Sequence, residues 1–103
     1  MMSDPTFVEP EHLRTLIASG KEVVIVDVRA ADEFSAHHID GAINIPADQL
    51  STRAVTIAKD AAIVTVCNFG GQRSCNAAEQ LRAMGYENAV PLRGGTQGWL
   101  EQT

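Results

Sequence analysis

The chain has 103 residues, 45% of them hydrophobic and 20% charged, which suffices for one folded domain and excludes disorder as its main description. Thirteen acidic residues against eight basic ones give a formal net charge of −5, which removes the electrostatic basis for general nucleic-acid binding. Any anion site must therefore be built locally, by a few well-placed groups.

Helices and strands are predicted to alternate along the chain. The helices are predicted at Pro10–Ser19, Ala31–Ala36, part of Asp48–Asp60, Ser74–Met84 and a terminal stretch that holds Trp99 and Leu100. The strands are predicted at Val23–Val28, Ala42–Ile45, Ala62–Val66 and Ala89–Leu92. This alternation predicts an α/β fold with a mainly parallel sheet and right-handed crossovers.

Local signals set the first of these elements. Proline suits the first helical turn at Pro10, and Gly20 is expected to end that helix. Leu13, Leu16 and Ile17 fall on one helical face, which is expected to be apolar. The continuous apolar run over residues 23–28 is typical of a strand that is covered on both faces.

The N-terminal residues contain neither a basic stretch nor an apolar run, so no secretory signal is predicted, and no segment is long enough to span a membrane. Two cysteines cannot define a disulfide scaffold, and a reducing cytoplasm is the expected location. We expect a flexible N-terminus over residues 1–6, a single domain over residues 7–103, and no membrane or nucleic-acid partner.

The most informative stretch covers residues 64–74. An apolar run stops at Cys67, opens into a glycine-rich loop and closes on Arg73-Ser74, where a helical pattern begins. In an α/β protein, backbone N–H groups and the helix dipole converge on anions at such a loop. These groups favour the thiolate of a cysteine, which is otherwise only about 3% ionised at pH 7. We therefore predict that Cys67 is a nucleophile; the alternative is a small buried hydrophobic residue.

Three segments together resemble the rhodanese family of single-domain sulfurtransferases. They are Asp27-Val28-Arg29 with Glu33-Phe34 and His38–Pro46, then the cysteine loop ending in Arg73-Ser74, and last Leu92–Gly95 with Gly98-Trp99. The first is similar to the family's D-V-R…E-F…G-H-I-x-G-A-x-N-I-P signature, although His37 stands where the family usually has glycine. The resemblance implies a rhodanese-like three-layer fold, with a central, mainly parallel sheet flanked by helices.

The same resemblance implies a sulfurtransferase that uses no cofactor and no metal. Cys67 would attack the outer sulfur of thiosulfate or another sulfane donor, become a persulfide, and pass the sulfur to cyanide or a thiol, a protein thiol included. Thiosulfate, a protein persulfide and glutathione persulfide all stay open as donors. The loop's backbone N–H groups and Arg73 would hold the donor. The predicted substrate-binding residues are Asn68, Phe69, Gly70, Gly71, Gln72, Arg73 and Ser74.

The spacing in the loop departs from that family. Five residues separate Cys67 from Arg73, whereas the usual rhodanese loop has four. Five is the C-x5-R spacing of cysteine phosphatases and arsenate reductases, whose wider loop surrounds a tetrahedral oxyanion. Those phosphatases usually carry histidine before the cysteine, where this chain has Val66. A phosphatase, an arsenate reductase and a non-catalytic regulatory module therefore remain as alternatives to the sulfurtransferase.

Several neighbouring residues have a structural interpretation beside a functional one. Asp27 and Arg29 are predicted to support the loop or to form a structural ion pair. Ser74 is predicted to cap the following helix or to contact substrate. Gly70 and Gly71 are expected to adopt positive φ angles or to approach a ligand closely.

The remaining candidates lie outside the loop. Cys75 is predicted to be a buried residue, with a resolving thiol for Cys67 as the alternative. His37 and His38 have no third ligand at suitable spacing, so turn and packing roles are expected instead of a metal pair. Phe34 and Trp99 are expected to belong to the core or a pocket wall.

Overall fold

The structure is a computed structural model that describes residues 7–20, 22–69 and 71–101. Its centre is a parallel four-stranded sheet in the order β2-β1-β3-β4. The strands are β1 (Val23–Asp27), β2 (Ile43–Asn44), β3 (Ala62–Val66) and β4 (Ala89–Pro91). A parallel bridge between Val8 and Leu92 adds the N-terminal segment beside β4. The predicted flexible N-terminus, residues 1–6, lies outside the described residues.

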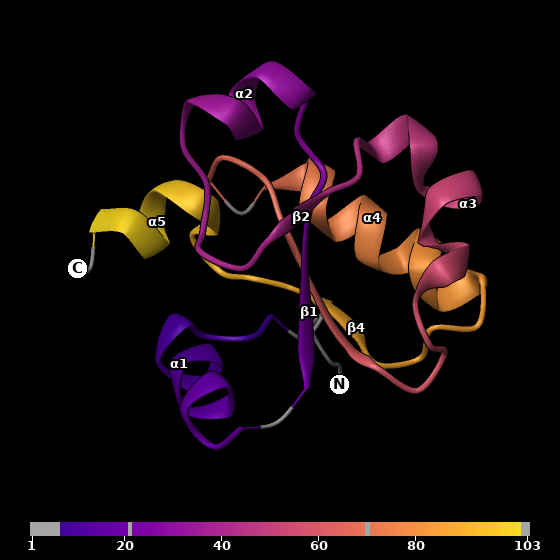
Figure 1. The fold of residues 1–103 in the computed structure, drawn as a ribbon, viewed down its shortest axis with the longest axis horizontal. Helices are drawn as coiled ribbons and strands as arrows, with labels where there is room; N and C mark the ends of the chain where they lie inside the picture. The colour runs from indigo at the N-terminus through magenta and orange to yellow at the C-terminus, as the bar shows by residue number, and fades with distance from the viewer. Residues whose placement is uncertain (1–6, 21, 70, 102–103) are drawn as a thin grey trace.

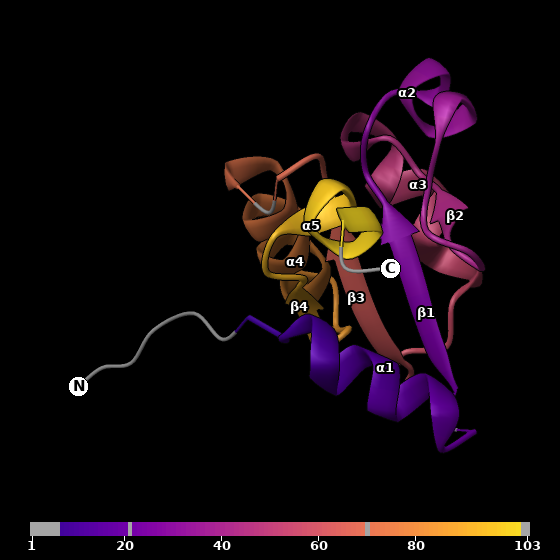
Figure 2. The ribbon, with the colours of Figure 1, turned by 90° about the vertical axis from the view of Figure 1, so that its left-hand side faces the viewer.

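Helices cover both faces of the sheet (Figures 1 and 2), which confirms the predicted three-layer α/β fold. They are α1 (Pro10–Ala18), α2 (Ala31–Ala36), α3 (Leu50–Arg53), α4 (Gln72–Ala83) and α5 (Gly95–Glu101), with 3₁₀ turns η1 (Ala47–Gln49) and η2 (Ala54–Thr56) on either side of α3. Helices α1 and α5 lie on one face, and α3 and α4 lie on the other. Within the described residues, no helix has the length and apolar character that crossing a bilayer requires.

Side chains of β1 alternate between two apolar clusters, one on each face of the sheet. Val24 and Val26 belong to the cluster that also holds Leu81 of α4. Ile25 belongs to the cluster that holds Leu13 of α1. The prediction that this strand is covered on both faces is therefore confirmed, because successive strand residues point in opposite directions.

Some predicted boundaries and faces were wrong. The predicted strand 42–45 shortens to β2, whereas the prediction that residues 48–60 are helical in part is confirmed by α3 and its 3₁₀ turns. Leu13 is fully buried, but Ile17 is 46% exposed, because α1 contacts the sheet along a narrower stripe than the apolar pattern suggested. Helix α4 begins at Gln72 rather than Ser74, which places Arg73 inside its first turn.

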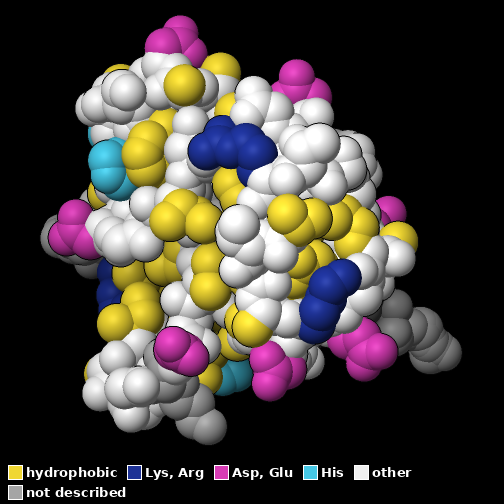
Figure 3. All heavy atoms as spheres, turned by 45° about the vertical axis from the view of Figure 1, so that its right-hand side comes forward, with side chains coloured by type: hydrophobic (Ala, Val, Ile, Leu, Met, Phe, Trp, Pro, Cys, Tyr) yellow, Lys and Arg dark blue, Asp and Glu magenta, His cyan; other side chains and the backbone are white. Residues whose placement is uncertain are grey.

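Charged side chains are dispersed over the face of the molecule that Figure 3 shows. Figure 3 views the molecule from the side of α3 and α4, where apolar and polar side chains are interspersed and acidic side chains lie toward the outline. The net charge of −5 is therefore not gathered into one patch on this face. Local groups, rather than a broad charged surface, decide which anions a site here accepts.

Candidate active site

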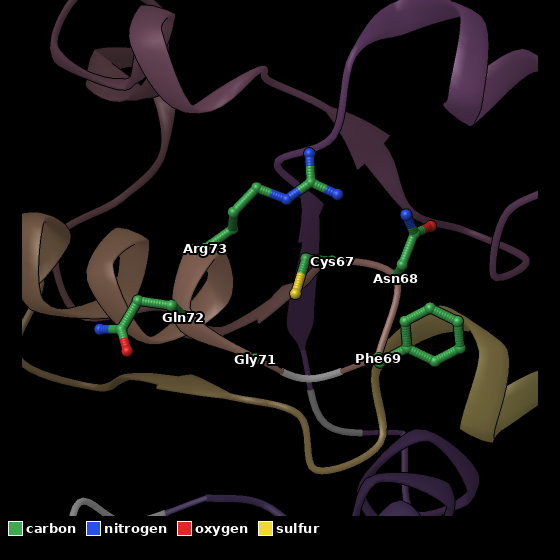
Figure 4. A pocket seen from close by; sticks show the side chains of 6 residues that line it. All are labelled: Cys67, Asn68, Phe69, Gly71, Gln72 and Arg73. Carbon is green, nitrogen blue, oxygen red and sulfur yellow. The ribbon is translucent and has the colours of Figure 1, made fainter.

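Cys67 lies directly after β3, at the carboxyl end of the sheet, as predicted. Its side chain is only 4% exposed and forms part of the wall of an open cavity of about 240 Å³. Figure 4 shows the cavity's lining residues, which are Cys67, Asn68, Phe69, Gly71, Gln72 and Arg73. The structure thus brings together most of the residues predicted to bind substrate; Gly70 lies outside the described residues.

The loop is held at both ends by hydrogen bonds from outside it. The first amides of α5 donate to its start, from Thr96 N to the Cys67 carbonyl (2.8 Å) and from Gln97 N to the Asn68 carbonyl (2.9 Å). At its end, the Thr65 hydroxyl donates to the Ser74 carbonyl (2.8 Å). The position of Cys67 therefore depends on α5, which is distant in sequence.

The start of α4 differs from the prediction in two ways. Gly71 is the N-cap and has a φ of −93°, so of its two predicted roles, a positive φ and close approach to a ligand, it does not have the first. Ser74 is buried inside the helix, and its hydroxyl donates to the Gly71 carbonyl (3.1 Å) instead of accepting a capping bond. The helix starts two residues earlier than predicted, which moves Ser74 past the capping position. The N–H groups of the first turn of α4 consequently adjoin the cavity.

A buried ion pair lies beneath the loop. Asp27 and Arg29 are 0% and 1% exposed, and the Arg29 guanidinium donates to the Asp27 carboxylate from Nη2 (2.8 Å) and Nε (2.9 Å). Its remaining nitrogen bonds reach the His37 carbonyl (2.8 Å) and the Asn68 side-chain oxygen (3.0 Å). The hydrogen bond to Asp27 raises the pKa of Arg29, against the opposing effect of burial.

Glu33 is a site residue that the sequence reasoning missed. Its Oε2 accepts a bond from the Asn68 amide (3.1 Å), and its Oε1 accepts one from Ala30 N (3.1 Å) and lies 3.6 Å from Arg73 Nη1. The backbone bond from Ala30, followed by the bond from Asn68, lowers the pKa of Glu33. The sequence did hold a signal for the bond to Ala30, because a glutamate three residues after the start of a helix often accepts a hydrogen bond from the N–H at that start.

The side chains of the loop point in different directions (Figure 4). The Arg73 guanidinium lies on the side of α2, whereas the Cys67 sulfur points away from it, toward the inside of the loop. Gln72 turns outward, and its amide donates to the Asn76 side chain (2.9 Å). The ring of Phe69 lies beside α5 and is 73% exposed. The cavity thus has a cationic group on one side and an exposed aromatic ring on another.

Phe34 is half-buried and belongs neither to the two apolar clusters nor to the wall of this cavity, so the expectation of a core or pocket-wall position is not confirmed for it. The His38 ring stacks on Phe34, with ring centroids 3.9 Å apart, and its Nδ1 lies 2.8 Å from the Phe34 carbonyl oxygen. Trp99 packs against the apolar cluster on the α1 side. Cys75 is half-buried rather than buried, and burial, followed by the nearby Cys67, raises the pKa of its thiol. The two cysteines are not joined by a disulfide.

A cysteine that follows a parallel strand and opens a loop into a helix defines an α/β protein with a cysteine-centred site at the carboxyl end of its sheet. The chain belongs to the rhodanese family, because the family model of the rhodanese-like domain matches residues 9–102. The family resemblance drawn from the sequence is confirmed.

Relatives and solved structures support the same assignment. Thiosulfate sulfurtransferase GlpE of Shewanella oneidensis is 35% identical over 82% of this chain and 83% of that protein. The human single-domain sulfurtransferase TSTD1 has a TM-score of 0.82 and 30% identity, over 98% of this chain and 99% of that one. The adenylyltransferase and sulfurtransferase uba4 of Ogataea parapolymorpha is 35% identical over 76% of this chain.

The length of the match differs among these relatives. The chain spans only about a fifth of uba4 and about a quarter of the probable adenylyltransferase/sulfurtransferase MoeZ of Mycobacterium tuberculosis. By contrast, it covers most of the thiosulfate sulfurtransferase relatives. The relatives described here are named as sulfurtransferases, and none of these is named as a phosphatase or an arsenate reductase, the alternatives that the loop spacing left open.

Proposed function

We propose that the protein is a sulfurtransferase that carries one sulfane sulfur as a persulfide on Cys67. The observation that carries this proposal is the position of Cys67, in the wall of a cavity between the end of β3 and the first turn of α4. The likeness to thiosulfate sulfurtransferase GlpE over most of both chains supports it. Donors are thiosulfate or a related sulfane compound, and acceptors are cyanide, a small thiol or a protein thiol.

The proposed reaction has two balanced steps. The Cys67 thiolate attacks the outer sulfur of thiosulfate, the bond between the two sulfur atoms of thiosulfate breaks, and sulfite leaves with the electron pair of that bond. The enzyme is left as a Cys67 persulfide anion. Cyanide then attacks the outer sulfur of the persulfide, which yields thiocyanate and restores the thiolate. A thiolate acceptor reacts in the same way and becomes a persulfide itself.

The surroundings of Cys67 suit these steps. The N–H groups in the first turn of α4 stabilise negative charge on the sulfur and on the donor. Arg73 supplies a positive charge at the edge of the cavity. We assign Asp27 and Arg29 a positioning role, because the Arg29 guanidinium holds the side chain of Asn68, the residue after the nucleophile.

Intact-protein mass spectrometry after treatment with thiosulfate tests the proposal. We expect the wild type to gain the mass of one sulfur atom, removable by dithiothreitol, and Cys67→Ser to gain none. Cys75→Ser is the matched control, because it removes the other thiol and should load like the wild type. Loading that persists in Cys67→Ser, or that disappears in a folded Cys75→Ser, would contradict the assignment of the nucleophile.

A further inference from the structure

The positive charge of the cavity is already partly neutralised. Arg73 Nη1 lies 3.6 Å from Glu33 Oε1, and the side chains of both residues are partly exposed. Glu33 is held there by Ala30 N and by the Asn68 amide, so it does not depend on Arg73 for its position. A donor that needs Arg73 must therefore compete with a fixed carboxylate.

Glu33 also acts directly on an incoming anion. The same two hydrogen bonds lower its pKa, so Glu33 stays ionised at neutral pH. A dianion that reaches Arg73 comes within a few ångströms of this carboxylate, where like charges repel even in a well-solvated setting. An uncharged or singly charged donor experiences less of this repulsion. The electrostatics of the cavity edge thus disfavour thiosulfate relative to donors of lower charge.

Phe69 offers a different kind of contact. Among the described residues, four large hydrophobic side chains are exposed, and Phe69 is the most exposed of them and the one that lines the cavity; the others are Ile17, Ile43 and Val55. Figure 4 shows its ring at the cavity on the side away from Arg73. When an apolar substituent of the donor covers part of the Phe69 ring, apolar surface of both groups is removed from water, and this burial favours binding. Thiosulfate has no such substituent.

We propose that the preferred donor is an organic persulfide with an apolar substituent, selected by Phe69 and by the carboxylate of Glu33. This inference rests on the proposed sulfur transfer at Cys67 and names the donor for it. The Cys67 thiolate attacks the outer sulfur of R–S–SH, the bond between its two sulfurs breaks, and RS⁻ leaves. The sulfur arrives with its proton as Cys67–S–SH, so the step needs no further reactant.

Single-turnover loading of Cys67 by three donors tests this inference: thiosulfate, methyl hydropersulfide and benzyl hydropersulfide. The last two share one reacting group and differ in apolar surface. We expect the wild type to load at least about tenfold faster from the benzyl than from the methyl donor, which corresponds to covering roughly 60 Å² of apolar surface. In Phe69→Ala the two rates should become nearly equal. Val55→Ala is the matched control, because Val55 is exposed but lies outside the cavity.

Glu33→Gln tests the electrostatic part. It should raise the second-order rate constant for thiosulfate roughly three- to tenfold and change that for methyl hydropersulfide less than twofold. The gain should vanish in Glu33→Gln/Arg73→Ala, whereas a merely structural Glu33 would lower loading from both donors. Glu9→Gln, which breaks a comparable exposed pair with Arg93 outside the cavity, should leave both rates unchanged.

The outcomes separate the two proposals. If no donor loads Cys67 in the wild type, the proposed function itself is wrong. If Cys67 loads but benzyl and methyl donors react equally, or Phe69→Ala leaves their ratio intact, the donor inference is wrong while sulfur transfer stands. Thiosulfate loading that falls or stays constant in folded Glu33→Gln overturns the inference in the same way.

Discussion

Replacing Arg29 by methionine should strongly destabilise the protein. The substitution keeps an unbranched side chain but removes the guanidinium from the fully buried Asp27 carboxylate. Among the described residues, the hydrogen bond that this carboxylate would keep comes from the backbone N–H of residue 29, at 3.0 Å. Breaking a buried pair in this way costs about 3–5 kcal/mol, because one charge stays buried without a partner.

That loss is large for a chain of this size. Small domains unfold with a free energy of about 5–15 kcal/mol, and about 1 kcal/mol shifts Tm by about 4–8 °C at this length. We therefore expect Arg29→Met to lower Tm by at least about 12 °C and to shift the urea midpoint accordingly. Circular dichroism during thermal and urea unfolding measures both quantities.

Two companion variants make the test specific. Asp27→Asn/Arg29→Met removes both charges, so it should be more stable than Arg29→Met alone. Arg93→Met removes an exposed arginine that pairs with Glu9 at 2.7 Å and should cost less than about 1 kcal/mol. If Arg29→Met lowers the free energy of unfolding no more than Arg93→Met does, the buried pair does not stabilise the fold. If Arg29→Met fails to fold, the double variant still tests the role of the buried pair, because it is expected to fold, and a double variant that also fails to fold would contradict that role.

Three further predictions concern single side chains. The Thr96 hydroxyl is buried without a hydrogen-bond partner among the described residues, so Thr96→Val should raise the free energy of unfolding by about 1 kcal/mol; a comparable loss in urea unfolding would refute this. Tyr86→Phe should cost about 1–2 kcal/mol, because the buried hydroxyl donates to the Ala54 carbonyl at 2.6 Å; an unchanged urea midpoint would count against that bond. Burial raises the pKa of Cys75, so iodoacetamide should alkylate it more slowly in the folded than in the unfolded Cys67→Ser variant at pH 8. Because the pKa of the Cys75 thiol is raised in the folded state, the stabilising contribution of Cys75 should fall as the pH rises through the ordinary thiol pKa, where only the unfolded chain loses the proton. Equal alkylation rates in the folded and unfolded states would contradict the raised pKa.

Local signals in the sequence were sufficient to predict several elements. The strand predicted at residues 62–66 and the short helix predicted at residues 31–36 have the observed bounds. Such elements can be predicted without knowledge of packing, because an apolar run of strand length and the residues that end it are adjacent in the sequence. Because Cys67 directly follows such a strand, its place at the carboxyl end of the sheet followed from the same local signal.

The surroundings of the nucleophile, in contrast, come from contacts between distant parts of the folded chain. Glu33 and Arg29 reach Asn68 across 35 and 39 residues of sequence, and α5 donates to the Cys67 carbonyl from Thr96. The ion pair of Arg73 likewise depends on the position of α2, because its partner Glu33 belongs to that helix. Such contacts form between elements that the parallel sheet brings to one edge, and no periodicity or spacing in a single sequence encodes the distances between them. The charge and shape of the cavity therefore had to be taken from the folded chain.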